Sequence, residues 1–293
     1  MVLKCYLCRS LKIKKFLVKH DYQLYRCGSC GLIFYEFREG LKEFLDKQYA
    51  RGYFKGQEDL CSYYDYAADM EVTKRNFRDY LKQISVYQPA GRLLDVGCAY
   101  GYFMQEAQHA GYQVWGIDPS EHAISQAKKG LPTQVKKATL AGAGFAPRSF
   151  EVITMFDVFE HLPDPRADLK VVNKILTDGG LLVIATGDTG SFWAKIWGKK
   201  WTFYNPPQHI FYFNQENIIR ILQESGFKVI KIEKSGKWLP IRYILHLART
   251  VRENRLERWL FPFFQNNFLG KIALFLRFND NMIIFAQKNV EKG

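Results

Sequence analysis

The stretch of sequence at residues 93–103, LLDVGCAYGYF, decides the fold. An apolar run that contains Asp95 leads into a turn with glycines at 97 and 101, and a helical pattern follows. A strand, a glycine turn and a helix in this order form a ligand-binding site at the carboxyl edge of a doubly wound sheet. A dinucleotide fingerprint would need glycines at 97, 99 and 102, whereas the chain has Ala99 and Tyr102. The pattern therefore predicts a nucleoside-type site that is not an NAD site.

Strand-like and helix-like segments alternate on both sides of this turn. Apolar strand-like runs occupy 92–96, 112–118, 133–138, 150–156, 180–186, 227–234 and 281–288, and helical patterns occupy 101–111, 120–130, 165–176 and 214–226. Alternation of this kind predicts a mostly parallel sheet with helices on both faces. We therefore expect the α/β class, with a doubly wound, Rossmann-like sheet.

A second acid ends the next strand-like run, in GIDPS at 116–120. Asp118 lies 23 residues after Asp95, which is the length of one strand–helix–strand unit. An acid at this place in a doubly wound fold accepts hydrogen bonds from ribose hydroxyls. We expect Asp118 to hold the sugar of a nucleoside ligand.

The cysteines predict a metal site near the N-terminus. Cys5 and Cys8 form one C-x-x-C pair, and Cys27 and Cys30 form another, with 18 residues between the pairs. This spacing is typical of zinc sites, and four thiolates leave no open coordination position. Two disulfides or a redox pair are the alternatives, and a reducing cytosol disfavours them. We expect residues 1–38 to form a ribbon around a structural Zn²⁺.

Charge and hydropathy limit the location of the protein and its partners. The net charge is +13, which suits nucleic acid, phosphorylated ligands or an anionic membrane surface and does not choose among them. The start has no signal-peptide pattern, and no apolar run approaches the ~18 residues of a membrane span. We expect a cytoplasmic protein. The apolar and basic stretch 237–277 fits a lid or a dimer contact, and a peripheral contact with the inner face of the membrane is the third option.

Several stretches together carry a family resemblance. They are RCGSCGLIFY (26–35), QYARGYF (48–54), LLDVGCAYGYF (93–103), GIDPS (116–120), FEVITMFDVFEHLPDP (150–165), PPQHIFYFN (206–214) and ESGFKV (224–229). With them the chain resembles class I S-adenosylmethionine-dependent methyltransferases, in particular the bacterial group that fuses a cysteine ribbon to the methyltransferase core, related to ubiquinone-biosynthesis O-methyltransferases. The resemblance implies a seven-stranded sheet whose last strand is antiparallel.

The resemblance also implies roles for the residues of the glycine turn. Asp95, Gly97 and Gly101 would surround the methionine part of S-adenosylmethionine, and Asp118 would bind its ribose. Ala99 stands where the family often has a third glycine, and its small side chain is compatible with the cofactor.

Methyl transfer to a hydroxyl needs a base that removes the proton. Ligands of a doubly wound sheet bind at the carboxyl ends of the strands, so we expect the base there. The segment FDVFEHLPDP (156–165) supplies Asp157, Glu160 and His161. By resemblance these three would hold a divalent metal; alternatively, the Glu–His pair orders the loop over the cofactor. His209 is the second candidate base, and a structural histidine is the alternative. We expect Asp157, His161 and His209 to be the catalytic candidates.

Three further segments complete the expected organisation. Residues 39–90 form a helical linker and cofactor lid, and residues 91–293 form the methyltransferase core. Within the core we expect an aromatic substrate loop at 186–213, with packing of its tryptophans as the alternative, and a lid insertion at 237–277.

The favoured function is O-methylation of a hydroxyl group on a sugar, a glycan or a secondary metabolite. An RNA methyltransferase that holds RNA through the basic ribbon is one alternative. A protein that binds S-adenosylmethionine without catalysis is the other.

Overall fold

A seven-stranded sheet forms the centre of the computed structural model, which describes residues 3–37, 40, 67–234, 236–251, 264 and 267–290. The strand order is β10-β13-β8-β7-β4-β5-β6. Strands β4 (Arg92–Val96), β5 (Gln113–Asp118), β6 (Val135–Lys137), β7 (Phe150–Phe156), β8 (Leu176–Gly187) and β10 (Phe227–Lys234) run parallel, and β13 (Asn281–Lys288) lies antiparallel between β8 and β10. The expected doubly wound sheet with an antiparallel last strand is confirmed.

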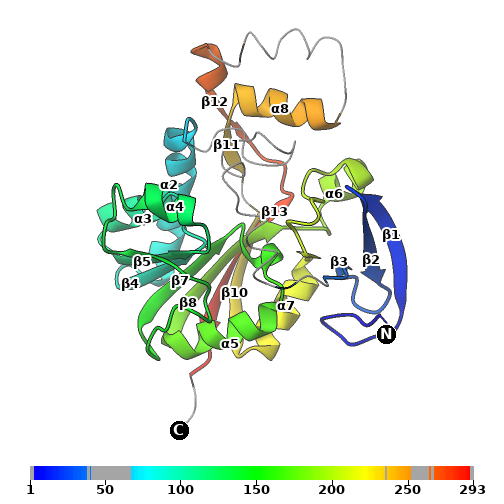
Figure 1. Ribbon diagram of the computed structural model, residues 1–293, viewed down its shortest axis with the longest axis horizontal. Helices are drawn as coiled ribbons and strands as arrows, with labels where there is room; N and C mark the ends of the chain where they lie inside the picture. Colours follow the sequence, from blue (N-terminus) through cyan, green and yellow to red (C-terminus); the bar gives the residue numbers. More distant parts are fainter. Residues whose placement is uncertain are drawn as a thin grey trace.

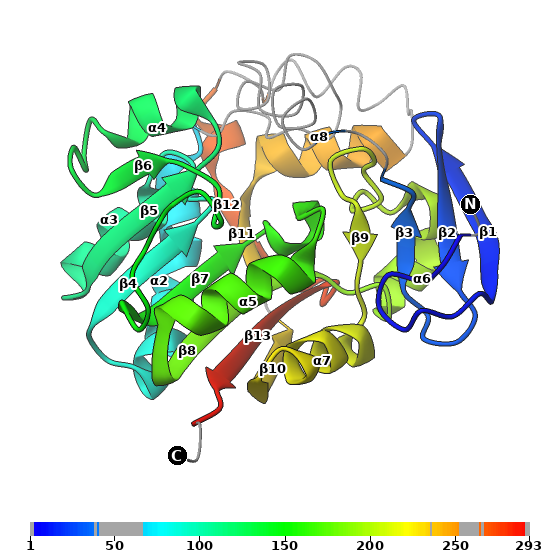
Figure 2. The ribbon, with the colours of Figure 1, turned by 60° about the horizontal axis from the view of Figure 1, so that its bottom comes forward.

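Helices cover both faces of this sheet because its strands are apolar on both sides. Neighbouring residues of one strand enter different cores: Leu93 packs with α2 (Met70–Tyr87), α3 (Tyr102–His109) and α4 (Glu121–Ala127), whereas Leu94 packs with α5 (Pro165–Ile175) and α7 (Gln215–Glu224). Figures 1 and 2 show α5 and α7 on the face opposite α2 and α3. The alternation follows from the two-residue period of a strand.

Side-chain caps fix where the helices begin. Ser120 accepts a hydrogen bond from the N–H of Ala123, and Asp164 accepts one from the N–H of Ala167. These caps start α4 and α5 directly after the loops that leave β5 and β7, so the first turns of both helices lie at the carboxyl end of the sheet.

The N-terminal ribbon joins the core through a shared sheet. Strands β1 (Ile13–Lys19), β2 (Tyr22–Cys27) and β3 (Ile33–Tyr35) are antiparallel, and β3 pairs with β9 (Phe211–Tyr212) from the segment that follows α6 (Phe192–Trp197) and η2 (Gly198–Lys200). Figure 2 shows the ribbon beside β9 and α6. Ribbon residues such as Leu24 and Leu32 share one hydrophobic cluster with the core helices. The ribbon is thus packed as part of the main body.

A two-stranded antiparallel sheet covers the carboxyl end of the main sheet. Strand β11 (Lys237–Pro240) pairs with β12 (Ala273–Leu276), and α8 (Ile241–Val251) and η3 (Leu269–Lys271) flank the pair, at the top of Figure 1. Trp238 exchanges backbone hydrogen bonds with the side-chain amide of Asn76 on α2, at 2.8 and 3.0 Å. Of the expected linker 39–90 and lid 237–277, residues 39, 41–66, 252–263 and 265–266 lie outside the described residues. No helix among the residues that the structure describes has the length and apolarity needed to cross a bilayer.

Candidate active site

A cavity of 420 Å³ opens at the carboxyl ends of β4, β5 and β7, beside the β11–β12 strand pair. Its wall includes residues of the three strand ends, of α2 and of β11. The acidic, basic, aromatic and glycine-turn residues of the wall include Asp95, Gly97, Ala99, Asp118, Asp157, His161, Asp164, Phe77, Tyr80, Phe103, Phe156, Lys237, Trp238 and Tyr243. From the sequence, the first six are expected as site residues. For α2 and β11 the sequence predicts lid segments at 39–90 and 237–277 but not the residues that line the cavity.

The glycine turn has the backbone shape that the sequence predicts. Gly97, Ala99 and Gly101 have φ values of 74°, 46° and 76°. A Cβ atom at position 97 would collide with Val158 in the loop after β7. Position 116 also requires glycine, which the sequence analysis does not predict, because a Cβ atom there would collide with the sulfur of Met104. The two glycines let the turn close against its neighbours, and Ala99 adopts a left-handed conformation that costs an L-residue about 1 kcal/mol.

Asp118 holds the turn and retains capacity for a ligand. Its Oδ2 accepts a hydrogen bond from the Ala99 N–H at 3.0 Å, and its Oδ1 accepts one from the Ser120 N–H at 2.8 Å. Each carboxylate oxygen has a second lone pair. Burial raises the pKa of Asp118 to about 6. The carboxylate is therefore fixed in place and able to accept two further hydrogen bonds from the cavity side.

Asp95 is the second buried acid of the turn. Its Oδ1 accepts a hydrogen bond from Thr154 Oγ1 of β7 at 2.7 Å. Burial raises the pKa of Asp95 to about 7, and the charge of Asp118 adds to the increase. Two acids at one cavity wall, each 4% exposed, favour a ligand that carries positive charge.

Asp157 and His161 line the same cavity beyond the turn. Asp157 has a φ of 53°, and its Oδ2 lies 3.4 Å from Lys237 Nζ of β11. Burial opposes the charge on Lys237, but Asp157 and further neighbours raise the pKa of the lysine overall. Burial lowers the pKa of His161 to about 4, so this imidazole is neutral at pH 7. The cavity thus holds an ion pair and a neutral imidazole near each other.

His209 packs against His161 and is not among the residues that line the cavity. Its Nδ1 is 2.7 Å from the carbonyl oxygen of Phe203, and its ring centroid is 4.7 Å from that of His161. Burial lowers the pKa of His209 well below its usual value. The role of His209 as a base therefore stays a prediction; of the two histidines, His161 is the one that lines the cavity.

The expected metal group of Asp157, Glu160 and His161 is not the one that the structure gathers. Glu160 and His161 meet His209, with ligand atoms within 4.8 Å of one another, while Asp157 pairs with Lys237. Burial and the charge of Asp157 raise the pKa of Glu160. The local spacing could not show this, because His209 lies 48 residues after His161 in the chain.

The aromatic loop contributes packing. None of the cavity-lining residues falls within 186–213. Trp201 is 2% exposed, and its Nε1 donates to Asp280 Oδ2 at 3.0 Å. Tyr204 is equally buried and packs edge-on against Trp201. The expected substrate loop therefore lies outside the wall of this cavity.

The four ribbon cysteines converge as a metal site requires. Cys5 Sγ lies 3.6 Å from Cys30 Sγ, and Cys8 Sγ lies 3.5 Å from Cys27 Sγ. All four sulfurs are within 4.8 Å of one another. A disulfide bond would need about 2.05 Å, whereas a tetrahedral zinc ion with Zn–S bonds of about 2.3 Å separates its sulfurs by about 3.8 Å. The donor set and its spacing fit Zn²⁺.

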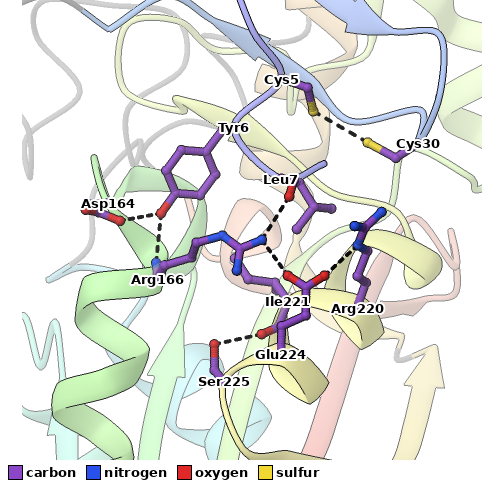
Figure 3. Close-up of polar contacts among 10 residues, drawn as sticks. All are labelled: Cys5, Tyr6, Leu7, Cys30, Asp164, Arg166, Arg220, Ile221, Glu224 and Ser225. Carbon is purple, nitrogen blue, oxygen red and sulfur yellow. Dashed lines mark hydrogen bonds and ion pairs between the residues drawn. The ribbon is translucent and has the colours of Figure 1, made fainter. Parts of the chain in front are cut away.

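The first knuckle of the ribbon is fastened to the cavity wall (Figure 3). The Tyr6 hydroxyl hydrogen-bonds Asp164, and it accepts a bond from the Arg166 N–H at 2.9 Å. The Arg166 guanidinium donates to the Leu7 carbonyl at 2.8 Å and pairs with Glu224 of α7. Asp164 both caps α5 and lines the cavity. The ribbon thereby fixes the loop between β7 and α5.

Comparisons with known proteins agree with this geometry. A family model described as a methyltransferase domain matches residues 59–232. The ubiquinone biosynthesis O-methyltransferase of a Caulobacter species is 35% identical over 103 residues, which make up 32% of this chain and 40% of that protein. The enzyme of the same name from Marinobacter nauticus is 25% identical over 188 residues, or 56% of this chain and 79% of that protein.

Solved structures show the same fold. A SAM-dependent methyltransferase from Archaeoglobus fulgidus superimposes with a TM-score of 0.52 at 22% identity, over 78% of this chain and 100% of that one. The chain spans about two fifths of the length of the first curated relative. The expected resemblance to class I methyltransferases is confirmed, and the chain belongs to the methyltransferase domain family.

Proposed function

We propose that this protein transfers the methyl group of S-adenosylmethionine to an oxygen atom of a small acceptor. One observation carries the proposal. The first half of the glycine turn, residues 97–99, and the fixed carboxylate of Asp118 share a single cavity with Asp157 and His161. Gly101, the other glycine predicted for this site, is not among the lining residues, and its Cβ position faces Leu131. One part of the cavity suits a nucleoside, and the other part offers groups that can accept a proton.

The residues of the turn suit each portion of the cofactor. Asp118 would accept hydrogen bonds from the two ribose hydroxyls with the lone pairs that Ala99 and Ser120 leave free. Gly97 would allow close approach of the backbone to the methionine portion. Asp95 is buried at the same wall and would counter the positive charge of the donor. When bound, S-adenosylmethionine supplies an electrophilic methyl group on a sulfonium.

The acceptor needs orientation and loss of a proton. His161 is neutral, stands in the wall and can take a proton from a hydroxyl. Lys237 lies near Asp157 and would stabilise the negative charge that develops on the oxygen. Aromatic side chains make up much of the remaining wall: Phe77, Tyr80, Phe103, Phe156, Trp238 and Tyr243. They favour a hydroxyl carried on a ring, as in a phenol, a sugar or a secondary metabolite.

The relatives named for ubiquinone biosynthesis O-methylation support an oxygen nucleophile. We also propose that the four ribbon thiolates hold a structural Zn²⁺, because four sulfur ligands leave no position for a substrate. The zinc would then act on the reaction only through the ribbon contacts to Asp164.

The test is a transfer assay with radiolabelled methyl donor. The protein is incubated with fractions of a cell lysate that separate small molecules, glycans, lipids and RNA. We expect label in a small-molecule or glycan fraction, stable to conditions that cleave methyl esters and lost in Asp118→Ala. Label in RNA would support the RNA alternative. Binding of the donor with no labelled product in any fraction would support a protein without catalysis.

A further inference from the structure

The first knuckle of the ribbon, residues 5–8, carries two metal-binding cysteines and also contacts the cavity wall. Tyr6 lies between Cys5 and Cys8, in a turn that belongs to no strand. Two backbone hydrogen bonds close this turn, from the Cys5 N–H to the Ser10 carbonyl and from the Arg9 N–H to the Cys5 carbonyl, at 3.0 Å each. A metal ion bound by both cysteines would order the turn further and fix the position of Tyr6.

The Tyr6 side chain reaches from this knuckle to the start of α5 (Figure 3). Its hydroxyl donates a hydrogen bond to Asp164 Oδ1 and accepts one from the Arg166 N–H at 2.9 Å. Its ring packs on Phe211 of β9, with the two ring centroids 4.7 Å apart. Tyr6 is therefore held between β9 and the first turn of α5.

Asp164 connects this contact to the cavity. It lines the cavity together with Leu162, Pro163 and Ala167. The oxygen that accepts the Tyr6 hydroxyl, Oδ1, also caps α5 by accepting the Ala167 N–H at 3.2 Å. A displacement of this oxygen therefore shifts the wall loop and the first turn of α5 together.

The second knuckle, residues 27–30, is attached to a different part of the core. The side-chain amide of Asn217 on α7 donates to the Cys30 carbonyl at 2.7 Å, and Asn217 is 1% exposed. No residue of α7, which the structure describes in full, lines the cavity. Of the two knuckles, the first is thus the one that hydrogen-bonds a wall residue.

We infer that Tyr6 is a positioning residue that couples the ribbon metal to the cofactor cavity, so that binding at either site strengthens binding at the other. The inference rests on the proposed binding of S-adenosylmethionine in the cavity and of Zn²⁺ in the ribbon. The metal orders the first knuckle, the knuckle holds Tyr6, and Tyr6 holds the wall loop in the arrangement that the nucleoside contacts. Coupling between two binding sites is reciprocal, so each ligand must change the affinity for the other by the same factor.

Two equilibrium measurements on the purified full chain test this coupling. Calorimetry gives the Kd for S-adenosylhomocysteine with Zn²⁺ bound and after its removal by a chelator in reducing buffer. Competition with a chromophoric chelator gives the Kd for Zn²⁺ with and without saturating S-adenosylhomocysteine. In the wild type each ligand should lower the Kd of the other by the same factor, of about fivefold or more.

Two variants separate positioning by Tyr6 from the general stability of the ribbon. Zinc-loaded Tyr6→Phe should bind S-adenosylhomocysteine more weakly than the wild type, and the nucleoside should lose most of its effect on the Kd for Zn²⁺. Asn217→Ala removes a core contact of the second knuckle and should keep the wild-type coupling. Deuterium exchange of residues 157–168, measured without nucleoside, should be faster in Tyr6→Phe and unchanged in Asn217→Ala, because only the first substitution releases the wall loop.

The inference would be overturned by a Kd for Zn²⁺ that does not respond to bound S-adenosylhomocysteine, by full coupling in Tyr6→Phe, or by equal losses in both variants. If the zinc-free chain does not fold, the comparison of the zinc-loaded variants decides the question. If the zinc-loaded wild type binds no S-adenosylhomocysteine, the proposed function fails. Deuterium exchange then still decides whether Tyr6 positions the wall loop, and equal exchange in wild type and Tyr6→Phe would show that it does not.

Discussion

Removal of the Asp118 carboxylate should weaken binding of the cofactor far more than removal of a nearby surface charge. In Asp118→Ala the nucleoside loses two hydrogen bonds to ribose hydroxyls. The variant should bind S-adenosylhomocysteine about 1–3 kcal/mol more weakly, which corresponds to a roughly 5- to 150-fold larger Kd. The loss of the bonds to the Ala99 and Ser120 N–H groups should loosen the turn and move the value toward the upper end.

Isothermal titration calorimetry measures the effect, with Glu121→Ala as the matched control. Glu121 lies three residues from Asp118 and pairs with Lys137 on the surface. Its removal changes the net charge equally and should leave the Kd within about twofold, because exposed pairs contribute little. Equal Kd values for wild type and Asp118→Ala, with a folded variant by circular dichroism, would refute the assignment of this carboxylate to the ribose.

Four other predictions address the turn, the protonation of its acids and the ribbon. Ala99→Gly should raise the free energy of unfolding by about 0.5–1 kcal/mol, because glycine adopts the φ of 46° without the penalty of an L-residue; lower stability in urea would contradict this. Affinity for S-adenosylhomocysteine should fall as the pH drops, by roughly tenfold for each unit below about pH 6. The reason is that only the ionised Asp118, with its pKa raised to about 6, accepts hydrogen bonds from both ribose hydroxyls. Calorimetry from pH 5 to 8 would show an affinity independent of pH if the carboxylate took no part in binding. The free energy of unfolding of the ligand-free protein should have the opposite pH dependence to the affinity. Burial raises the pKa values of Asp95 and Asp118, so stability is lost as the pH rises from about 4 to 7 and their carboxyls ionise in a buried site. Tyr6→Phe should lower the free energy of unfolding by about 1–2 kcal/mol, because the hydrogen bonds to Asp164 and Arg166 are lost. Equal stability of Tyr6→Phe and a Tyr25→Phe control would show that the Tyr6 hydroxyl does not stabilise the contact between the ribbon and the core.

The parts of the fold that the sequence predicts are those with a local signal. The strands at 92–96 and 150–156 are short apolar runs, and the turn at 97–101 has glycines at fixed positions. The cysteine pairs identify the ribbon because a metal site imposes its spacing on the chain. The mostly parallel sheet follows from the alternation of strands and helices, and its seven strands with an antiparallel last strand follow from the family resemblance.

The parts that the sequence does not predict depend on contacts between distant segments. Strand β9 has two residues and becomes a strand only by pairing with β3. His209 meets Glu160 because the backbone of Ile210 bonds to η1 (Phe159–His161), and no local pattern records that contact. The aromatic residues of 186–213 have the composition of a binding loop, yet Trp201 and Tyr204 pack into the core. Composition alone cannot distinguish an aromatic wall from an aromatic core.

The central claim is that the turn at 97–101 and the carboxylate of Asp118 bind the nucleoside of S-adenosylmethionine. Calorimetric titration of the purified wild-type protein with S-adenosylhomocysteine tests it most directly. We predict one binding site per chain, with S-adenosylmethionine competing for the same site. Absence of binding heat with both compounds at several temperatures, in a protein that unfolds cooperatively, would contradict the claim.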